Sequence, residues 1–234
     1  MSTLLLRLKA PQQSWGTDSR FRYRATGLMP SKSGVLGLLA AAQGRARDAD
    51  LTDLVGLSFA VRVDQPGRLM VDYHTARRPG AKNSALSHRH YRVDAAYAAA
   101  VSGPASLIEG LSDAIDAPVF PLFLGRRSCP APVCLNGGTF PDSEPEALLR
   151  DLERAPWLAS EWYRKESPVD VRLPIYRDAA AGEVGESVQD IPVSFDPRHR
   201  QHSTRKVVQA PPVQVENADG CTPRDPFFQT VMET

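Results

Sequence analysis

The stretch from residue 4 to residue 42 constrains the fold of this chain more than any other, because it encodes three elements in direct succession. Leu4, Leu6 and Leu8 recur at every second position, a spacing that predicts a strand, and Pro11 is expected to end it. From Ser31 onward, glycine, alanine and leucine residues predict a tightly packed helix. The segment between them is rich in arginine, so a basic loop is expected to lead the chain to the helix start.

The start of this helix is a candidate anion site. The first backbone N–H groups of a helix have no partner inside it, and the helix dipole adds partial positive charge there. Full charges are added by four side chains at the helix start and in the preceding loop: Lys32, Arg20, Arg22 and Arg24. A phosphate group is therefore the expected ligand. The segment Gly27-Leu-Met-Pro-Ser-Lys-Ser lacks the second glycine that a nucleotide P-loop places before its lysine, which argues against nucleotide hydrolysis.

A second basic segment, residues 77–92, contains no acidic residue. Its cationic and imidazole side chains are Arg77, Arg78, Lys82, Arg89, Arg92, His88 and His90. Cations neutralise phosphates, and an aromatic ring such as that of Tyr91 can stack on an unpaired base. The segment therefore favours a protruding hairpin that grips RNA over the alternative of a solvated loop.

The rest of the first half alternates strands and helices. We expect a short helical piece at 51–54, strands at 58–64, 69–75 and 95–101, a helix at 105–115 and a strand at 119–124. Together with the first strand and helix, this is the strand, helix, strand, strand, helix, strand order of the ferredoxin-like fold, which also underlies RNA-recognition modules. The predicted fold class is α+β, with an RRM-like domain.

The second half is predicted to be a smaller, β-rich part. A short helix is expected at 144–154, strands at 169–176, 191–195 and 207–215, and a poorly ordered tail from Asn217. We therefore predict a ferredoxin-like domain over residues 1–124, with the protruding hairpin at about 76–93. A smaller C-terminal subdomain with a flexible tail is predicted over 125–234.

Charge is distributed unevenly between these parts. Residues 1–100 contain 15 Lys and Arg against 7 Asp and Glu, a net charge of +8. The remainder contains 13 basic and 20 acidic residues, a net charge of −7. A basic front half indicates a polyanion bound on one face.

Tyr73, His74 and Lys82 raise the alternative of metal-independent RNA cleavage, since a phenol, an imidazole and an ammonium group can act as base, acid and charge stabiliser. Tyr73 and His74 are neighbours in a predicted strand, however, so their side chains point to opposite faces and do not converge on one phosphate. A structural role, or RNA binding without cleavage, is favoured.

Two further clusters leave their alternatives open. Arg126 and Arg127 follow a predicted strand end, where they suit either phosphate contacts or pairing with carboxylates of the acidic second half. His199 and His202 offer weak support for a metal site, because no cysteine or carboxylate stands at a matching spacing. The cysteines, Cys129, Cys134 and Cys221, are too few for a four-ligand zinc site, so no metal or cofactor is expected.

Nothing in the sequence predicts a membrane location. Apolar runs stay well below the roughly 20 residues that a membrane-spanning helix needs. Leu4–Leu6 is too short for a signal-peptide core and is followed at once by charged residues. A cytoplasmic protein without membrane partners is expected.

Four separated motifs together resemble one family. They are Leu8-Lys-Ala-Pro-Gln-Gln-Ser-Trp-Gly16, Pro30-Ser-Lys-Ser-Gly-Val-Leu-Gly-Leu-Leu39, Asp72-Tyr-His-Thr75 and Leu124-Gly-Arg-Arg-Ser-Cys-Pro130. In this order they resemble the CasD family, the subunit of the type I-E CRISPR Cascade surveillance complex that holds the 5′ handle of the guide RNA (crRNA). This family belongs to the repeat-associated (RAMP) RNA-binding superfamily. The resemblance spans residues 4–130.

The resemblance implies a ferredoxin-like domain with a thumb-like hairpin and a non-catalytic role in antiviral defence. Such a subunit caps and bends the 5′ end of the crRNA. It docks the backbone subunit and the large subunit, and meets target DNA only through the complex. A separate subunit of such systems cuts the precursor RNA. A related subtype lacks that subunit and its corresponding protein cleaves the RNA itself, which keeps an endoribonuclease as the alternative.

The RNA-binding residues expected from these arguments fall in three groups. At the first helix and the loop before it they are Trp15, Arg20, Arg22, Arg24, Lys32 and Ser33. In the thumb and at its base they are His74, Arg77, Arg78, Lys82, Arg89 and Tyr91, with Arg126 and Arg127 nearby. Core packing is the alternative for Trp15.

Overall fold

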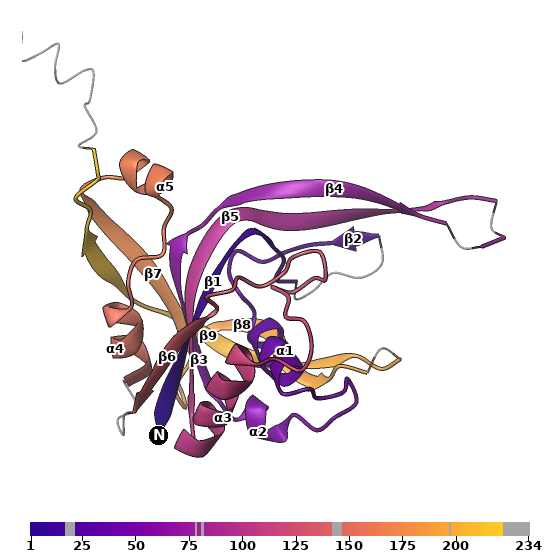
Figure 1. Cartoon of the computed structure of the whole chain (residues 1–234), viewed down its shortest axis with the longest axis horizontal. Helices are drawn as coiled ribbons and strands as arrows, with labels where there is room; N and C mark the ends of the chain where they lie inside the picture. Colours follow the sequence, from indigo (N-terminus) through magenta and orange to yellow (C-terminus); the bar gives the residue numbers. More distant parts are fainter. Residues whose placement is uncertain (17–21, 78, 81, 142–146, 197, 222–234) are drawn as a thin grey trace, which may run out of the picture.

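The computed structural model describes residues 1–16, 22–77, 79–80, 82–141, 147–196 and 198–221. In these residues one curved, largely antiparallel sheet runs in the order β6-β1-β5-β3-β7-β9-β8, and β2 and β4 pair with β5 beside this path (Figure 1). The strands are β1 (Ser2–Gln13), β2 (Tyr23–Arg24), β3 (Ser58–Gln65), β4 (Arg68–Ala76), β5 (Ala85–Gly103), β6 (Asn136–Pro141), β7 (Asp170–Asp178), β8 (Glu186–Ser194) and β9 (Gln201–Glu216). The helices are α1 (Lys32–Ala42), α2 (Thr52–Val55), α3 (Ala105–Asp116), α4 (Ala147–Arg154) and α5 (Glu161–Glu166).

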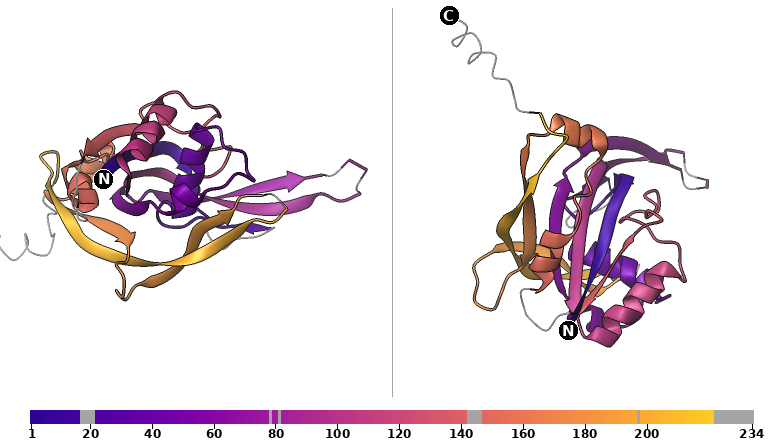
Figure 2. Two further views of the ribbon diagram at one scale, coloured as in Figure 1. Left: turned by 90° about the horizontal axis from the view of Figure 1, so that it is seen from below. Right: turned by 60° about the vertical axis from the view of Figure 1, so that its left-hand side comes forward.

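Strand β1 is buried on both of its faces. Leu4, Leu6 and Leu8 point into the main core, which α1 and α3 cover. Leu5 points the other way, into a second core that it shares with Leu148 of α4 and with residues of β7 and β9. Figure 2 shows α4 on the opposite side of the sheet from α1 and α3. The predicted strand is therefore confirmed, and packing covers both of its faces.

Strand β5 has two halves with different environments. Its inner half, Ala95–Val101, is buried and pairs with β1 on one side and β3 on the other. Small side chains such as Ala98 and Ala100 leave room for α4 to pack closely on the sheet. Its outer half pairs with β4 and extends away from the body (Figure 1).

The prediction of a strand at 119–124 is wrong. The described residues there form only an isolated bridge between Phe123 and Pro130, because Pro118 and Pro121 lack the N–H groups that a strand ladder needs. Val119 instead donates its backbone N–H to the carbonyl of Ala42, at the end of α1. The strand that pairs with the outer side of β1 is β6.

Other expectations need smaller corrections. Strand β1 continues past Pro11 to Gln13, where it still pairs with β5. The strands of the second half, β6 to β9, join the same sheet as β1, β3 and β5 rather than forming a separate one. Helix α5 was not expected, and most of the predicted tail lies outside the described residues. No helix in the described part of the chain is long and apolar enough to span a membrane.

A buried ion pair fastens α4 to the sheet. The guanidinium of Arg62 on β3 pairs with Asp64, at 2.6 and 2.9 Å, and neither side chain is accessible to solvent. Arg62 also donates to the carbonyls of Leu152, Ala155 and Pro156, so it satisfies acceptors at the C-terminal end of α4. Helix α4 and the residues that follow it cover both charges.

Arg62→Ala is expected to lower the free energy of unfolding by about 3–5 kcal/mol, because it leaves the buried carboxylate of Asp64 without its partner. Urea denaturation of the full chain measures the change. Arg172→Ala, at an exposed position on β7, is the matched control and should change stability by no more than about 0.5 kcal/mol. Equal effects of the two substitutions would show that the Arg62 pair does not hold α4.

Candidate nucleic-acid interface

The start of α1 is capped from inside the protein. The Ser31 hydroxyl accepts a hydrogen bond from the backbone N–H of Gly34, at 3.2 Å. The Asp190 carboxylate, which comes from β8, accepts from the backbone N–H of Lys32 at 2.7 Å. The positive end of the helix therefore already faces an anion, and that anion is a carboxylate of the same chain.

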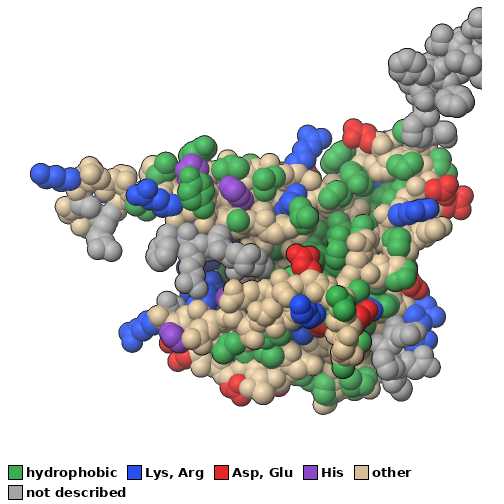
Figure 3. Space-filling model, turned by 180° about the vertical axis from the view of Figure 1, so that it is seen from behind, with side chains coloured by type: hydrophobic (Ala, Val, Ile, Leu, Met, Phe, Trp, Pro, Cys, Tyr) green, Lys and Arg blue, Asp and Glu red, His purple; other side chains and the backbone are tan. Residues whose placement is uncertain are grey.

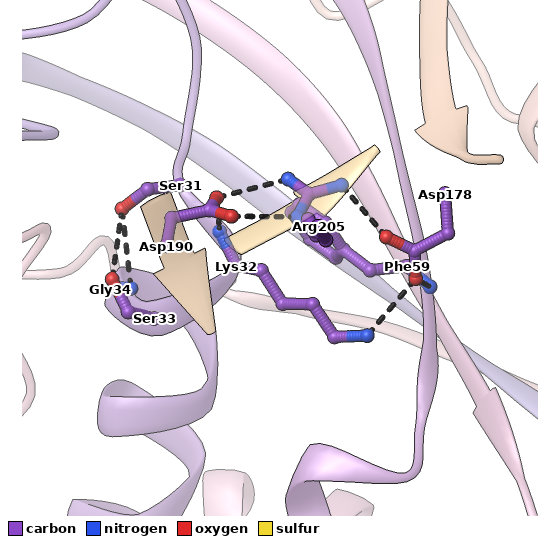
Figure 4. Close-up of polar contacts among 8 residues, drawn as sticks. All are labelled: Ser31, Lys32, Ser33, Gly34, Phe59, Asp178, Asp190 and Arg205. Carbon is purple, nitrogen blue, oxygen red and sulfur yellow. Dashed lines mark hydrogen bonds and ion pairs between the residues drawn. The ribbon is translucent and has the colours of Figure 1, made fainter. Parts of the chain in front are cut away.

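Four charged side chains form one cluster at this helix start (Figure 4). Lys32 binds Asp178 at 2.9 Å, and Arg205 of β9 binds Asp178 at 2.7 Å and Asp190 at 2.6 Å. Burial tends to lower the pKa of Arg205, but the hydrogen bonds and charges of Asp190 and Asp178 outweigh it and raise that pKa above its ordinary value. The cluster ties α1 to β7, β8 and β9, so it joins the two halves of the chain.

The prediction of an open phosphate site at the start of α1 is corrected by this cluster. Lys32 and Ser33 are both buried, and the Lys32 ammonium is engaged by Asp178. The sequence could not reveal this, because the two carboxylates lie more than 140 residues further along the chain. Their positions next to α1 are set by the pairing of β7, β9 and β8.

Trp15 is a core residue, the alternative that the sequence left open. Its side chain is 1% exposed, and its indole N–H donates to the side-chain oxygen of Gln13 at 3.0 Å. The ring packs so closely on α1 that a Cβ at Gly34 would lie 2.8 Å from it. Its backbone also bonds to Thr26 and Gly27, so Trp15 closes the base of the loop that carries the arginines.

The basic segment expected at 77–92 forms a projecting hairpin. Strand β4 pairs with residues 85–93 of β5, from Arg68 opposite Val93 to Ala76 opposite Ala85. Strand β2 adds to the other side of β5 as a short parallel pair. The hairpin extends well beyond the body of the protein (Figures 1 and 2). Residues 85–92 of the segment are therefore strand rather than loop, and the residues before them lie between the two strands.

The structure brings several predicted residues to this hairpin. Arg77 and Lys82 are exposed at its tip, and Arg22 and Arg24 are exposed on or beside β2. Arg89 is half-buried, and its Nε has no hydrogen-bond partner among the described residues. Two further predicted residues, Arg20 and Arg78, lie outside the described residues.

His74 lies on the hairpin, and its imidazole contacts the carboxylate of Asp72 on the same strand. Tyr73, between them, points to the opposite face and lies against His88, with 4.6 Å between ring centroids. The side chains of Tyr73 and His74 therefore do not converge on one point.

Tyr91 and Arg126 are internal contacts at the base of the hairpin. Tyr91 is buried, and its hydroxyl lies 3.2 Å from that of Ser128. The Arg126 guanidinium lies 4.8 Å from the centre of the Tyr91 ring and donates to the backbone carbonyls of His90 and Arg24. Arg126 thus joins β2 and β5 to the segment that follows α3. Its neighbour Arg127 is exposed.

The aromatic contacts of the hairpin were not predicted from the sequence. Tyr23 stacks on His88 with 4.8 Å between ring centroids and 19° between ring planes. The only signal was the presence of both residues in basic segments, and the strand register that pairs them was not predictable from either segment alone. The described residues contain no group of three or more His, Cys, Asp or Glu side chains placed to bind a metal ion.

Asp190→Asn is expected to destabilise the protein by about 2–4 kcal/mol, because it leaves the buried Arg205 with one carboxylate and removes the anion at the start of α1. The midpoint of urea unfolding measures the loss. Asp170→Asn, at an exposed position on β7, is the control and should be neutral within about 0.5 kcal/mol. If Asp190→Asn were equally neutral, the cluster would not be what holds α1 against the C-terminal strands.

Comparison with known proteins identifies relatives over nearly the whole chain. A family model described as CRISPR-associated protein (Cas_Cas5) matches residues 3–208. The chain is 36% identical over 174 residues to the CRISPR system Cascade subunit CasD of Escherichia coli (strain K12), which covers 65% of this chain and 77% of that relative.

Two solved structures of CRISPR-associated proteins have a similar fold. A chain of a CRISPR RNA-guided surveillance complex superposes with a TM-score of 0.74 at 29% identity, covering 99% of this chain and 98% of that chain. A structure described as a Cas protein superposes with a TM-score of 0.68 at 37% identity, covering 93% and 97%.

Proposed function

Because the chain belongs to the CRISPR-associated protein (Cas_Cas5) family, we propose that it is a non-catalytic subunit of a type I-E Cascade complex in the cytoplasm. In this role it binds and caps the 5′ handle of the crRNA. It docks the neighbouring backbone subunit and the large subunit, and it meets target DNA only through the assembled complex. The relatives support this proposal: one is a Cascade subunit, and one is a chain of an RNA-guided surveillance complex.

The arrangement of the sheet supports a ferredoxin-like RNA-binding domain. Strands β6, β1, β5 and β3 lie side by side, with α1 between β1 and β3 in sequence and α3 between β5 and β6. Both helices pack on the same core. In this proposal β6 is the fourth strand of the domain, so the domain extends to residue 141 instead of ending at 124. The projecting β4–β5 hairpin is its thumb.

The single observation that carries the proposal is the charge of the hairpin. We consider the described residues of the hairpin together with β2 and Arg22, which precedes β2. Asp72 is the one acid among them. Their cations are Arg22, Arg24, Arg68, Arg77, Lys82, Arg89 and Arg92. A projecting element with this excess attracts a chain of phosphates, and its length lets it follow several of them. Arg127 is exposed near the base of the hairpin and extends the same cationic surface. Lys32, Ser33 and Trp15 are buried, so in this proposal they stabilise the domain and do not contact the RNA.

The endoribonuclease alternative receives less support from the geometry. Metal-independent cleavage needs an acid and a base on opposite sides of one phosphate. Tyr73 and His74 lie on opposite faces of β4, so their side chains do not flank one phosphate. Lys82 lies at the tip of the hairpin, beyond the end of β4.

The affinity for a single-stranded RNA that carries a guide handle is expected to fall steeply with salt. Each phosphate contact contributes about 0.7 to the slope of log affinity against log salt concentration, so a double Arg77→Ala and Lys82→Ala variant should lower the magnitude of the slope by about 1.4. Fluorescence anisotropy of the full chain between about 50 and 200 mM KCl measures it. Arg172→Ala, which removes one exposed cation from β7, is the control and should leave the slope unchanged. A wild-type affinity independent of salt would contradict the proposal.

No specific cleavage of a CRISPR repeat RNA is expected when the purified full chain is incubated with it in EDTA. Gel electrophoresis of end-labelled RNA tests this expectation. A specific product that disappears in a His74→Ala variant would contradict the non-catalytic role and favour the endoribonuclease.

A further inference from the structure

Three rings form a row across the projecting hairpin. Strand pairing places Tyr23 of β2 and Tyr73 of β4 on either side of His88 in β5. Tyr23 stacks on His88 at 4.8 Å between centroids, and Tyr73 meets His88 edge-on at 4.6 Å with 61° between ring planes. We call Tyr23, His88 and Tyr73 the aromatic row.

The two tyrosines of the aromatic row are exposed to solvent, and His88 between them is half-buried. Tyr23 is 62% exposed and Tyr73 is 66% exposed, although burial of an aromatic ring is energetically favourable. The same face of the hairpin continues with Val71 and Leu86, which are also exposed. Figure 3 shows hydrophobic and histidine side chains gathered along the hairpin. A contiguous exposed patch of this kind on a soluble protein marks a binding surface.

The charges around the row define the ligand that fits it. Arg24, the residue after Tyr23 in β2, lies opposite Arg89 on the other face of the sheet, and Arg77 lies beyond Tyr73 toward the tip. The only acid among the described residues of the hairpin, Asp72, lies on the opposite face of β4 from Tyr73 and contacts His74. A ligand that matches both the exposed rings and the excess of cations carries planar rings and negative charge. Unpaired nucleotides have both, since every base has a π-face and every linkage has a phosphate.

A protein strand is the competing occupant. Among the described residues, β4 pairs only with β5, so its outer edge is available for strand addition. An added protein strand would bury apolar groups but would leave the excess of cations unpaired. Charge complementarity therefore favours nucleic acid.

We propose that the aromatic row of the hairpin is a stacking platform for unpaired nucleobases of the bound RNA. This inference rests on the proposed function and goes beyond it, because it separates side chains that stack on bases from the arginines and lysine that contact phosphates. On this platform Tyr23 and Tyr73 present open ring surfaces to bases, and His88 holds both rings in place. Stacking tolerates any base, so this surface adds affinity without reading sequence.

The test uses the full chain and a handle RNA with 2-aminopurine at successive unpaired positions. In the wild-type complex, fluorescence at one or two adjacent positions should be quenched by stacking. Tyr23→Leu and Tyr73→Leu keep apolar bulk but remove the ring surface, so they should restore that fluorescence. They should lower affinity about 5- to 150-fold, the range expected for one stacked base, while the salt slope stays unchanged.

Phe140→Leu is the matched control, because Phe140 is an exposed aromatic residue on β6, away from the hairpin. It should leave both affinity and fluorescence unchanged. Circular dichroism of each variant confirms that it is folded. Unchanged fluorescence and affinity in both tyrosine variants would overturn the platform, while a reduced salt slope in the Arg77 and Lys82 double variant would still support the proposed function.

Two other outcomes also overturn the inference. If the tyrosine variants keep RNA affinity but lose assembly with the protein subunits of the complex, the row is a protein-docking surface. If the wild-type chain binds no RNA at any salt concentration, the proposed function fails and the platform fails with it.

Discussion

The hydrogen-bond ladder of β5 is the constraint on which the rest of the structure depends. This one strand of 19 residues pairs with β1 and β3 over its inner half and with β4 and β2 over its outer half. The backbone that forms the centre of the core therefore continues without a break into the projecting hairpin. The two halves meet at Asp94, whose φ of +54° sets the direction in which the hairpin leaves the body.

Several cations of this protein bind carboxylates or carbonyls of the same chain and therefore have a structural role. Asp178 and Asp190 engage Lys32 and Arg205, and Asp64 engages Arg62. Arg126 donates to backbone carbonyls at the base of the hairpin. These cations hold elements together, because buried charges need partners. The cations of the hairpin outnumber its single acid, which is why the proposed RNA surface lies there and not at the start of α1.

Much of the fold was predictable from local patterns. The alternation of Leu4, Leu6 and Leu8 and the glycine, alanine and leucine residues from Ser31 onward correctly predicted β1 and α1, because such signals are local. The family resemblance is confirmed by the match over residues 3–208. The strand expected at 119–124 failed because two prolines exclude it from the ladder. The prediction of an open phosphate site at Lys32 was wrong, because the pattern of charges along the sequence does not reveal that β8 brings Asp190 to the helix start.

The sequence by itself determined the family, the first strand and helix, and the excess of basic residues in the front half. The tertiary structure alone decided which of those basic residues face solvent, since that depends on long-range strand pairing and helix packing. It buried Arg62 and Lys32 beside acidic partners and exposed Arg77 and Lys82 at the tip of the hairpin. It also placed Tyr23, His88 and Tyr73 side by side, because three separate segments meet in one register of the sheet.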